Sequence, residues 1–97
     1  MKIEEISERK TKDTIELEGK VIRANDPSDS EYGWSQRIIL RDDTGEMGCW
    51  LNLDTKDDKV AKGASIKLEG KLSAEYTDKR TGKLKRSING CKWNFVE

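Results

Sequence analysis

The stretch RIILRDDTGEMGCW, residues 37–50, carries two runs of strand-forming residues on either side of the turn sequence DDTG at 42–45. Aspartate at the start of such a turn accepts hydrogen bonds from backbone N–H groups, and glycine at its end can adopt a positive φ. The stretch therefore predicts an antiparallel hairpin with strands over about 34–41 and 46–53. It also raises the question of whether Trp50, in the second strand, faces the core or the solvent.

The first strand of this hairpin has only one phase that keeps charge out of the core. If Ile39 faced inward, Arg37 and Arg41 would face inward with it, because alternate residues of a strand share a face. Burying an unpaired guanidinium group costs several kcal/mol. We therefore expect Ile38 and Leu40 to lie inside and the other three residues to share the outer face.

The same alternation in the second strand predicts an inner set of Met47, Cys49 and Leu51 and an outer set of Glu46, Gly48, Trp50 and Asn52. An outward Trp50 can be a platform on which nucleobases stack, with Gly48 leaving room beside the ring for a base. The alternatives are that Trp50 packs on the N-terminal segment or a loop, or that a bulge turns it inward.

Two-residue alternation also predicts strands over about 14–24, 65–73 and 84–96. In the last of these, Ile88 is out of phase with Trp93 and Phe95, which we expect to plug the core. A bulge or kink at Gly90 would reconcile the two parts of the strand. Five short strands with glycines at mid-strand positions are typical of a small, strongly coiled barrel.

The connecting segments are polar and contain turn residues. Residues 24–33 contain the only proline and predict a loop, whereas residues 54–63 suit either a loop or one helical turn. Residues 74–83 predict a basic loop that ends in a second turn signal, Thr81-Gly82. At the N-terminus, Ile3 and Ile6 are placed to cap the open end of the core.

Length and composition indicate a single domain over residues 1–97, with 33% hydrophobic and 39% charged residues. The formal net charge is zero, yet residues 1–54 carry 8 basic and 13 acidic side chains and residues 55–97 carry 11 basic and 6 acidic ones. The absence of a long apolar run predicts no membrane span and no signal peptide, so we expect a soluble, cytoplasmic protein.

The inventory of reactive residues argues against catalysis and against a metal site. The chain has no histidine, and Cys49 and Cys91 are far apart in the sequence, which leaves too few nitrogen and sulfur ligands for zinc. The paired aspartates at 42–43 and 57–58 lie in turn or loop contexts that account for them. We therefore predict no enzyme activity, no cofactor, no metal and two buried thiols.

Three segments resemble the OB-fold nucleic-acid-binding domains, especially the single-stranded-DNA-binding modules of the replication protein A and archaeal type. They are LEGKV at 17–21, IILRDDTGEM at 38–47 and KGASIKLEGKL at 62–72. The likeness covers residues 12–96. It implies an all-β, five-stranded Greek-key barrel, with the segment between strands three and four as a loop or a short helical turn.

The resemblance also implies a binding cleft across the outer face of the second and third strands, walled by two loops. On the strands the implied contact residues are Arg37, Ile39, Arg41, Trp50 and Asn52. In the loops they are Tyr32, Trp34, Tyr76, Lys79, Arg80, Lys83 and Lys85. Trp34 is in phase with the core residues, so it either closes the barrel mouth or contacts a base, and the basic side chains either hold phosphates or form a solvated surface.

These observations favour a module that binds single-stranded nucleic acid by aromatic stacking and phosphate contacts, with little sequence preference. DNA is the favoured partner, and RNA is left open. The rival interpretation is an OB-fold interaction module in a larger nucleic-acid-processing complex or a homo-oligomer, in which Ile39 and Trp50 dock another protein.

Overall fold

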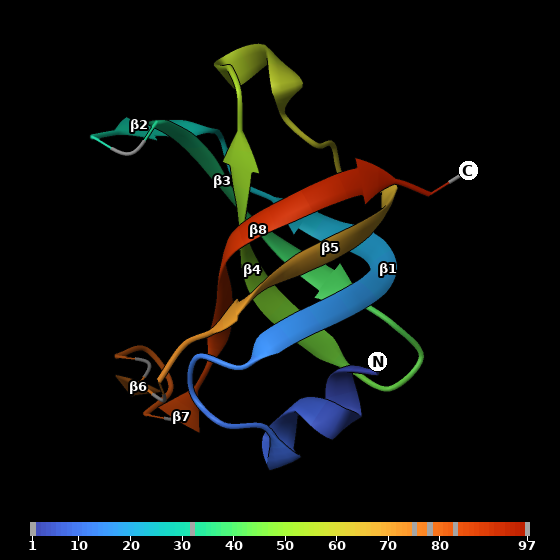
Figure 1. Ribbon diagram of the computed structural model, residues 1–97, viewed down its shortest axis with the longest axis vertical. Coiled ribbons are helices and arrows are strands. Elements are labelled where there is room, and N and C mark those ends of the chain that lie inside the picture. The colour runs from blue at the N-terminus through green and yellow to red at the C-terminus, as the bar shows by residue number, and fades with distance from the viewer. Residues whose placement is uncertain (1, 32, 75, 78, 83, 97) are drawn as a thin grey trace.

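A computed structural model describes residues 2–31, 33–74, 76–77, 79–82 and 84–96 (Figure 1). The order along the chain is η1 (Ile3–Glu8), β1 (Thr14–Ala24), β2 (Ser28–Ser30), β3 (Gly33–Arg41), β4 (Glu46–Leu53), η2 (Lys56–Asp58), β5 (Ser65–Leu72), β6 (Tyr76–Thr77), β7 (Leu84–Lys85) and β8 (Ser87–Phe95). Both η elements are short 3₁₀ helices. None of the helices in these ranges is long and apolar enough to span a bilayer.

Five of the strands close into a barrel. They follow the order β1-β5-β8-β4-β3, and a further pairing of β1 with β3 completes the ring. β4 and β8 run parallel, and the other neighbouring pairs of the ring are antiparallel. This is the five-stranded Greek-key barrel of the OB-fold, so the predicted fold class is confirmed.

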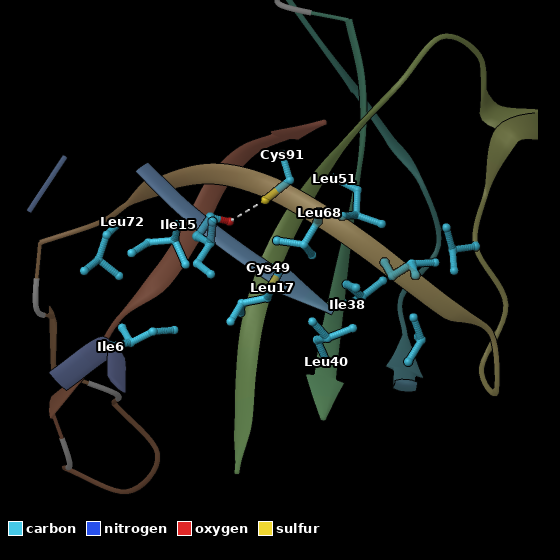
Figure 2. Packing of buried hydrophobic residues seen from close by; sticks show 14 of the residues in the cluster. Ile6, Ile15, Leu17, Ile38, Leu40, Cys49, Leu51, Leu68, Leu72 and Cys91 are labelled. Carbon is cyan, nitrogen blue, oxygen red and sulfur yellow. Dashed lines mark hydrogen bonds between the residues drawn. The ribbon is translucent and has the colours of Figure 1, made fainter. Parts of the chain in front are cut away.

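The barrel closes because one face of each strand is apolar. β5 alternates strictly between exposed and buried residues, and Ile38 and Leu40 of β3 are buried as the charge argument requires. Figure 2 shows buried side chains from the ring strands packed together, with Ile6 of η1 beside them. The core therefore lies inside the ring and is covered at one end by η1.

The predicted irregularity at Gly90 is present. Gly90 has a φ of +63°, and the β4–β8 register shifts so that Asn89 and Gly90 together lie opposite Trp50. Ile88 and Cys91 can both reach the core because of this extra residue, and both are fully buried. The bulge thus corrects the phase of β8 and leaves a residue without a side chain opposite Trp50.

At the end of the barrel opposite η1, the structure differs from the prediction. Phe95 was expected to plug the core, but it is 60% exposed. Val60, from the segment after η2, is buried in the core cluster. Gln36, 1% exposed, anchors this segment: its Nε2 donates to the Val60 carbonyl at 2.9 Å and its Oε1 accepts from the Val60 N–H at 2.7 Å. Trp93 packs against the core as expected, and its indole N–H donates to the Asn52 carbonyl at 3.0 Å.

The connecting segments hold more structure than the sequence indicated. The predicted loop over 24–33 contains β2, which pairs with β3. The segment over 54–63 contains the helical turn η2. The basic loop contains β6, which pairs with β7 at the start of the strand expected over 84–96, so that strand is divided into β7 and β8. β2 and the β6–β7 sheet project on the same side of the barrel in Figure 1.

Asp42 ties η1 to the β3–β4 turn. One carboxylate oxygen accepts the Thr44 N–H and hydroxyl at 2.7 and 2.6 Å and the Gly45 N–H at 3.1 Å, and the other accepts the Ile3 N–H at 2.7 Å. Partial burial raises the pKa of Asp42, but the hydrogen bonds from Thr44, Ile3 and Gly45 outweigh it, so the pKa lies below its ordinary value. Gly45 does not adopt the positive φ that is open to glycine at this position of the turn.

We expect Asp42→Asn to lower the free energy of unfolding by about 1 to 2 kcal/mol at neutral pH, because hydrogen bonds to a charged acceptor are lost. A lowered folded-state pKa stabilises the protein above the unfolded value of about 4, and this stabilisation disappears as the pH falls through the folded value. Urea unfolding from pH 7 to about pH 2.5 should therefore show the difference from wild type shrinking. The exposed Asp26→Asn is the matched control, and a difference that stays constant with pH would contradict this assignment.

Gly70 allows β5 and β8 to approach closely. A Cβ at this position would lie 2.7 Å from the Asn89 carbonyl oxygen, the Cys91 sulfur and an Ile88 methyl carbon. We expect Gly70→Ala to cost about 2 kcal/mol or more, because these are backbone and packed core atoms that cannot move aside. Gly48→Ala is the control and should change stability by less than about 0.5 kcal/mol. Equal thermal stability of the two variants would refute the packing argument.

Candidate nucleic-acid interface

The outer face of β3 and β4 is arranged by the register of the two strands. Arg37 lies opposite Trp50, Ile39 opposite Gly48 and Arg41 opposite Glu46. Trp50 is 38% exposed. The outward direction inferred from the cost of burying arginine is therefore correct, and Trp50 lies on the same face as Arg37.

Arg37 occupies the space over Gly48. A Cβ built on Gly48 would lie 3.4 Å from Nη2 and 3.9 Å from Nε of Arg37. The room beside Trp50 that we expected for a base is thus taken by a guanidinium group in this structure. Because this group is the end of a flexible side chain, it places positive charge at the centre of the face without closing the face permanently.

A hollow of about 750 Å³ lies between the β6–β7 sheet and the adjoining parts of β1 and β3. Ile39 and Tyr76 both line it, and Tyr76 is 41% exposed. The full lining is Arg23, Asn25, Arg37, Ile38, Ile39, Tyr76, Thr77, Lys79, Arg80 and Thr81. Four of these residues are cationic and none is acidic, so the described lining carries a net positive charge.

Most of this positive charge is not neutralised by neighbouring carboxylates. Arg23, Arg37 and Lys79 form no ion pair with any residue in the described ranges. Cations gathered in a concave site raise the local concentration of anions more than the same charges on a flat surface do. The hollow can therefore receive phosphate groups, while Ile39 and Tyr76 supply apolar and aromatic contacts.

A second, smaller hollow of about 340 Å³ adjoins the first. It is lined by Arg37, Ile39, Glu46, Met47, Gly48, Tyr76 and Arg86, so three residues belong to both hollows. Arg86 has a structural role, because its guanidinium donates to the Ser73 carbonyl at 3.2 Å, the Arg9 carbonyl at 2.9 Å and the Thr11 hydroxyl at 3.2 Å. These bonds hold the base of the β6–β7 sheet against the N-terminal segment.

The predicted site residues thus separate into groups. Arg37, Ile39, Tyr76, Lys79 and Arg80 come together in the first hollow, and Trp50 lies beside them on the outer face without lining either hollow. Tyr32 and Lys83 lie outside the described residues, as does the side chain of Lys85.

Three other predicted residues lie away from the two hollows. Arg41 lines a different hollow, near Lys20 and Lys62. Asn52 is at the far end of β4, where it lines a hollow with Trp93. Trp34 is partly buried against the core, which favours its role in closing the barrel mouth.

Arg23 and Glu46 line the hollows but were not predicted as site residues. Arg23 reaches the site because β1 has a register shift between Val21 and Arg23, which places Arg23 opposite Ile39. A bulge in a strand of alternating sequence leaves no clear signal in the residues themselves. Glu46 was expected on the outer face, but only the position of the β6–β7 sheet makes it part of a hollow.

The described residues contain no group of three or more histidine, cysteine, aspartate or glutamate side chains placed to hold a metal ion. Cys49 and Cys91 are free and buried. Burial raises the pKa of Cys91 to about 12 and that of Cys49 well above its ordinary value. Both thiols therefore stay protonated at neutral pH, and neither is a ready nucleophile.

No protein-family model and no curated protein matches the sequence. Several solved structures resemble the fold, and two of them are described here. One is the small single-stranded DNA-binding protein of Streptomyces coelicolor, 19% identical, with a TM-score of 0.62 and coverage of 88% of this chain and 94% of that one. The other is the Plasmodium falciparum SSB in complex with ssDNA, 18% identical, with a TM-score of 0.63 and coverage of 92% and 98%. At this identity the likeness shows a shared fold.

The exposure of Trp50 can be measured against the other two tryptophans, which are partly buried. We expect iodide to quench Trp50 most strongly, because its ring is accessible and Arg37 on the opposite strand attracts the anion. Trp50→Phe should remove most of the iodide-quenchable fluorescence, whereas the control Trp93→Phe should leave it. The reverse result would mean that the ring of Trp50 is covered in solution.

Proposed function

We propose that this protein binds single-stranded DNA, largely independently of sequence, across the outer face of β3 and β4 and in the hollow beneath the β6–β7 sheet. The observation that carries the proposal is the first hollow, with four cations and no carboxylate in its described lining. The fold shared with two single-stranded-DNA-binding proteins supports it, since one of them was solved with ssDNA.

Binding combines charge with stacking. The four cations of the larger hollow hold phosphates, and the rings of Tyr76 and Trp50 receive bases. Base stacking on an aromatic side chain is worth about 1 to 3 kcal/mol and tolerates any base, because each base has a π-face. A strand that contacts both rings has to cross Arg37, which lies opposite Trp50 and lines both hollows.

Within this function, we place the chain nearest the replication protein A and archaeal type of module, on the strength of IILRDDTGEM and KGASIKLEGKL. Binding without strong sequence preference suits a role in DNA replication, repair or recombination in the cytoplasm. The module acts by binding, not by catalysis. RNA is the second choice of ligand, and the comparison of oligo-dT with oligo-U separates the two.

A second candidate function is docking of another protein or of a second copy of the chain. Phe95 and Val96 are exposed at the end of β8, and Phe95 packs edge-on against Trp93 with ring centroids 5.1 Å apart. Trp50 lies outside both hollows, so with Ile39 it also fits this role. A dimer that persists in high salt and is lost on Phe95→Ser or Trp50→Ala would favour docking over DNA binding.

We expect a fluorescent oligo-dT to bind with an affinity that falls with salt at a log-log slope of about −3, since four cations that meet phosphates contribute about −0.7 each. Lys79→Gln should reduce the slope by about 0.7. Trp50→Ala and Tyr76→Ala should each weaken binding by about 5-fold or more through lost stacking. Fluorescence anisotropy at several salt concentrations measures all of these quantities.

The matched control for charge is Lys67→Gln, because Lys67 is exposed on β5, away from β3 and β4 in the ring. This variant should bind as the wild type does. Absence of binding to oligo-dT at about 50 mM salt would exclude the proposed function. Equal loss of affinity in Lys67→Gln and Lys79→Gln would show that the charge acts without a defined site.

A further inference from the structure

The smaller of the two hollows contains a carboxylate that the proposed function does not use. Glu46 lines it together with Met47, Gly48 and the three residues shared with the larger hollow. The side chain of Glu46 is exposed and forms no ion pair or hydrogen bond with any other described residue. This holds although Arg41 lies opposite it in the β3–β4 register and both Arg37 and Arg86 line the same hollow.

None of the three arginines supplies the missing partner, and Arg37 extends over Gly48. Arg86 is held by three hydrogen bonds to the N-terminal segment and the base of the β6–β7 sheet. Arg41 lines a different hollow, with Lys20 and Lys62. Glu46 therefore presents two acceptor oxygens and no donor to whatever enters the smaller hollow.

The two hollows thus differ in what they can accept. The described lining of the larger one holds four cations and no carboxylate. The smaller one holds the carboxylate of Glu46 beside the guanidinium groups of Arg37 and Arg86, with the apolar side chains of Ile39 and Met47 and the ring of Tyr76. Of the two hollows, only the smaller one would bring a phosphate against a carboxylate, and its Arg86 is already held by three hydrogen bonds. A strand that crosses both should therefore place phosphate in the larger hollow and a base in the smaller one. A carboxylate at the base edge favours a base that carries N–H donors there.

We propose that Glu46 gives this single-stranded-DNA site a preference for a base with an exocyclic amine, so that cytosine is taken over thymine at one position. Cytosine N4 carries two hydrogens and can donate to a carboxylate, as in base readout by acidic side chains in double-stranded DNA. Thymine presents its O4 oxygen at the same place, and this oxygen repels the carboxylate. The two bases are both pyrimidines, so size does not separate them.

This inference rests on the proposed function and is tested with oligonucleotides of equal length, dC15, dT15 and dU15, by fluorescence anisotropy at pH 8. The wild type should bind dC15 at least about 5-fold more tightly than dT15, the low end of what one good base contact contributes. The affinity for dU15 should equal that for dT15, because uracil lacks the thymine methyl group but has the same O4.

Glu46→Gln keeps the shape of the side chain and removes its charge. It should bring the dC15 to dT15 ratio close to 1, chiefly by tightening dT15 binding. The matched control, Glu16→Gln, changes an exposed glutamate on β1 and should keep the wild-type ratio. A ratio that Glu46→Gln leaves unchanged would overturn the assignment, as would a dU15 affinity that matches dC15 instead of dT15. Failure of all three oligonucleotides to bind would remove the proposed function itself, and the inference with it.

Discussion

The structure depends on the cost of burying charge in β3. Two arginines four residues apart, with Ile39 midway between them on the same face, leave one phase in which no guanidinium enters the core. That phase sends Ile38 and Leu40 inward, and the β3–β4 register then sets the phase of β4. The same constraint that builds one wall of the barrel therefore also builds the outer face.

Closing the barrel requires one glycine in β5 and one in β8, two strands that are neighbours in the ring. Gly70 lets β5 lie against β8, where any Cβ would meet backbone and core atoms. Gly90, with its positive φ, adds a residue to β8, so that both halves of the strand direct side chains to the core. This bulge also lies opposite Trp50. The glycine that lets β8 pack on the core therefore leaves the exposed ring of Trp50 less covered.

The sequence was sufficient for features that follow from local alternation and turn chemistry. A small all-β barrel, the phase of β3 and β4, the bulge at Gly90 and the outward Trp50 all belong to this group, whereas the Greek-key order of the strands came from the resemblance to OB-fold domains. The sequence was insufficient where two segments compete for the same end of the core. Phe95 has the right phase for the core, but Val60 fills that end of the barrel because Gln36 fastens its backbone there.

The candidate site shows the same division between local and long-range information. The basic character of residues 74–83 and the outer face of β3 could be read directly from the sequence. Their meeting in one hollow could not, because it depends on where the β6–β7 sheet lies over β3 and on the register shift that brings in Arg23. The position of Arg37 over Gly48 also depends on tertiary structure, since the two residues are on different strands.

The zero net charge of the chain is compatible with a polyanionic ligand when charge is considered locally. Screening at physiological ionic strength limits the reach of an exposed charge to about 8 Å. The molecule extends over 34 × 31 × 24 Å, so acidic side chains on its distant surfaces hardly lower the potential in the larger hollow. What governs ligand choice is therefore the composition of each hollow. In the larger hollow the cations lie together, whereas the described lining of the smaller one holds the carboxylate of Glu46, and under the proposed function this group is the one that would influence which base is accepted.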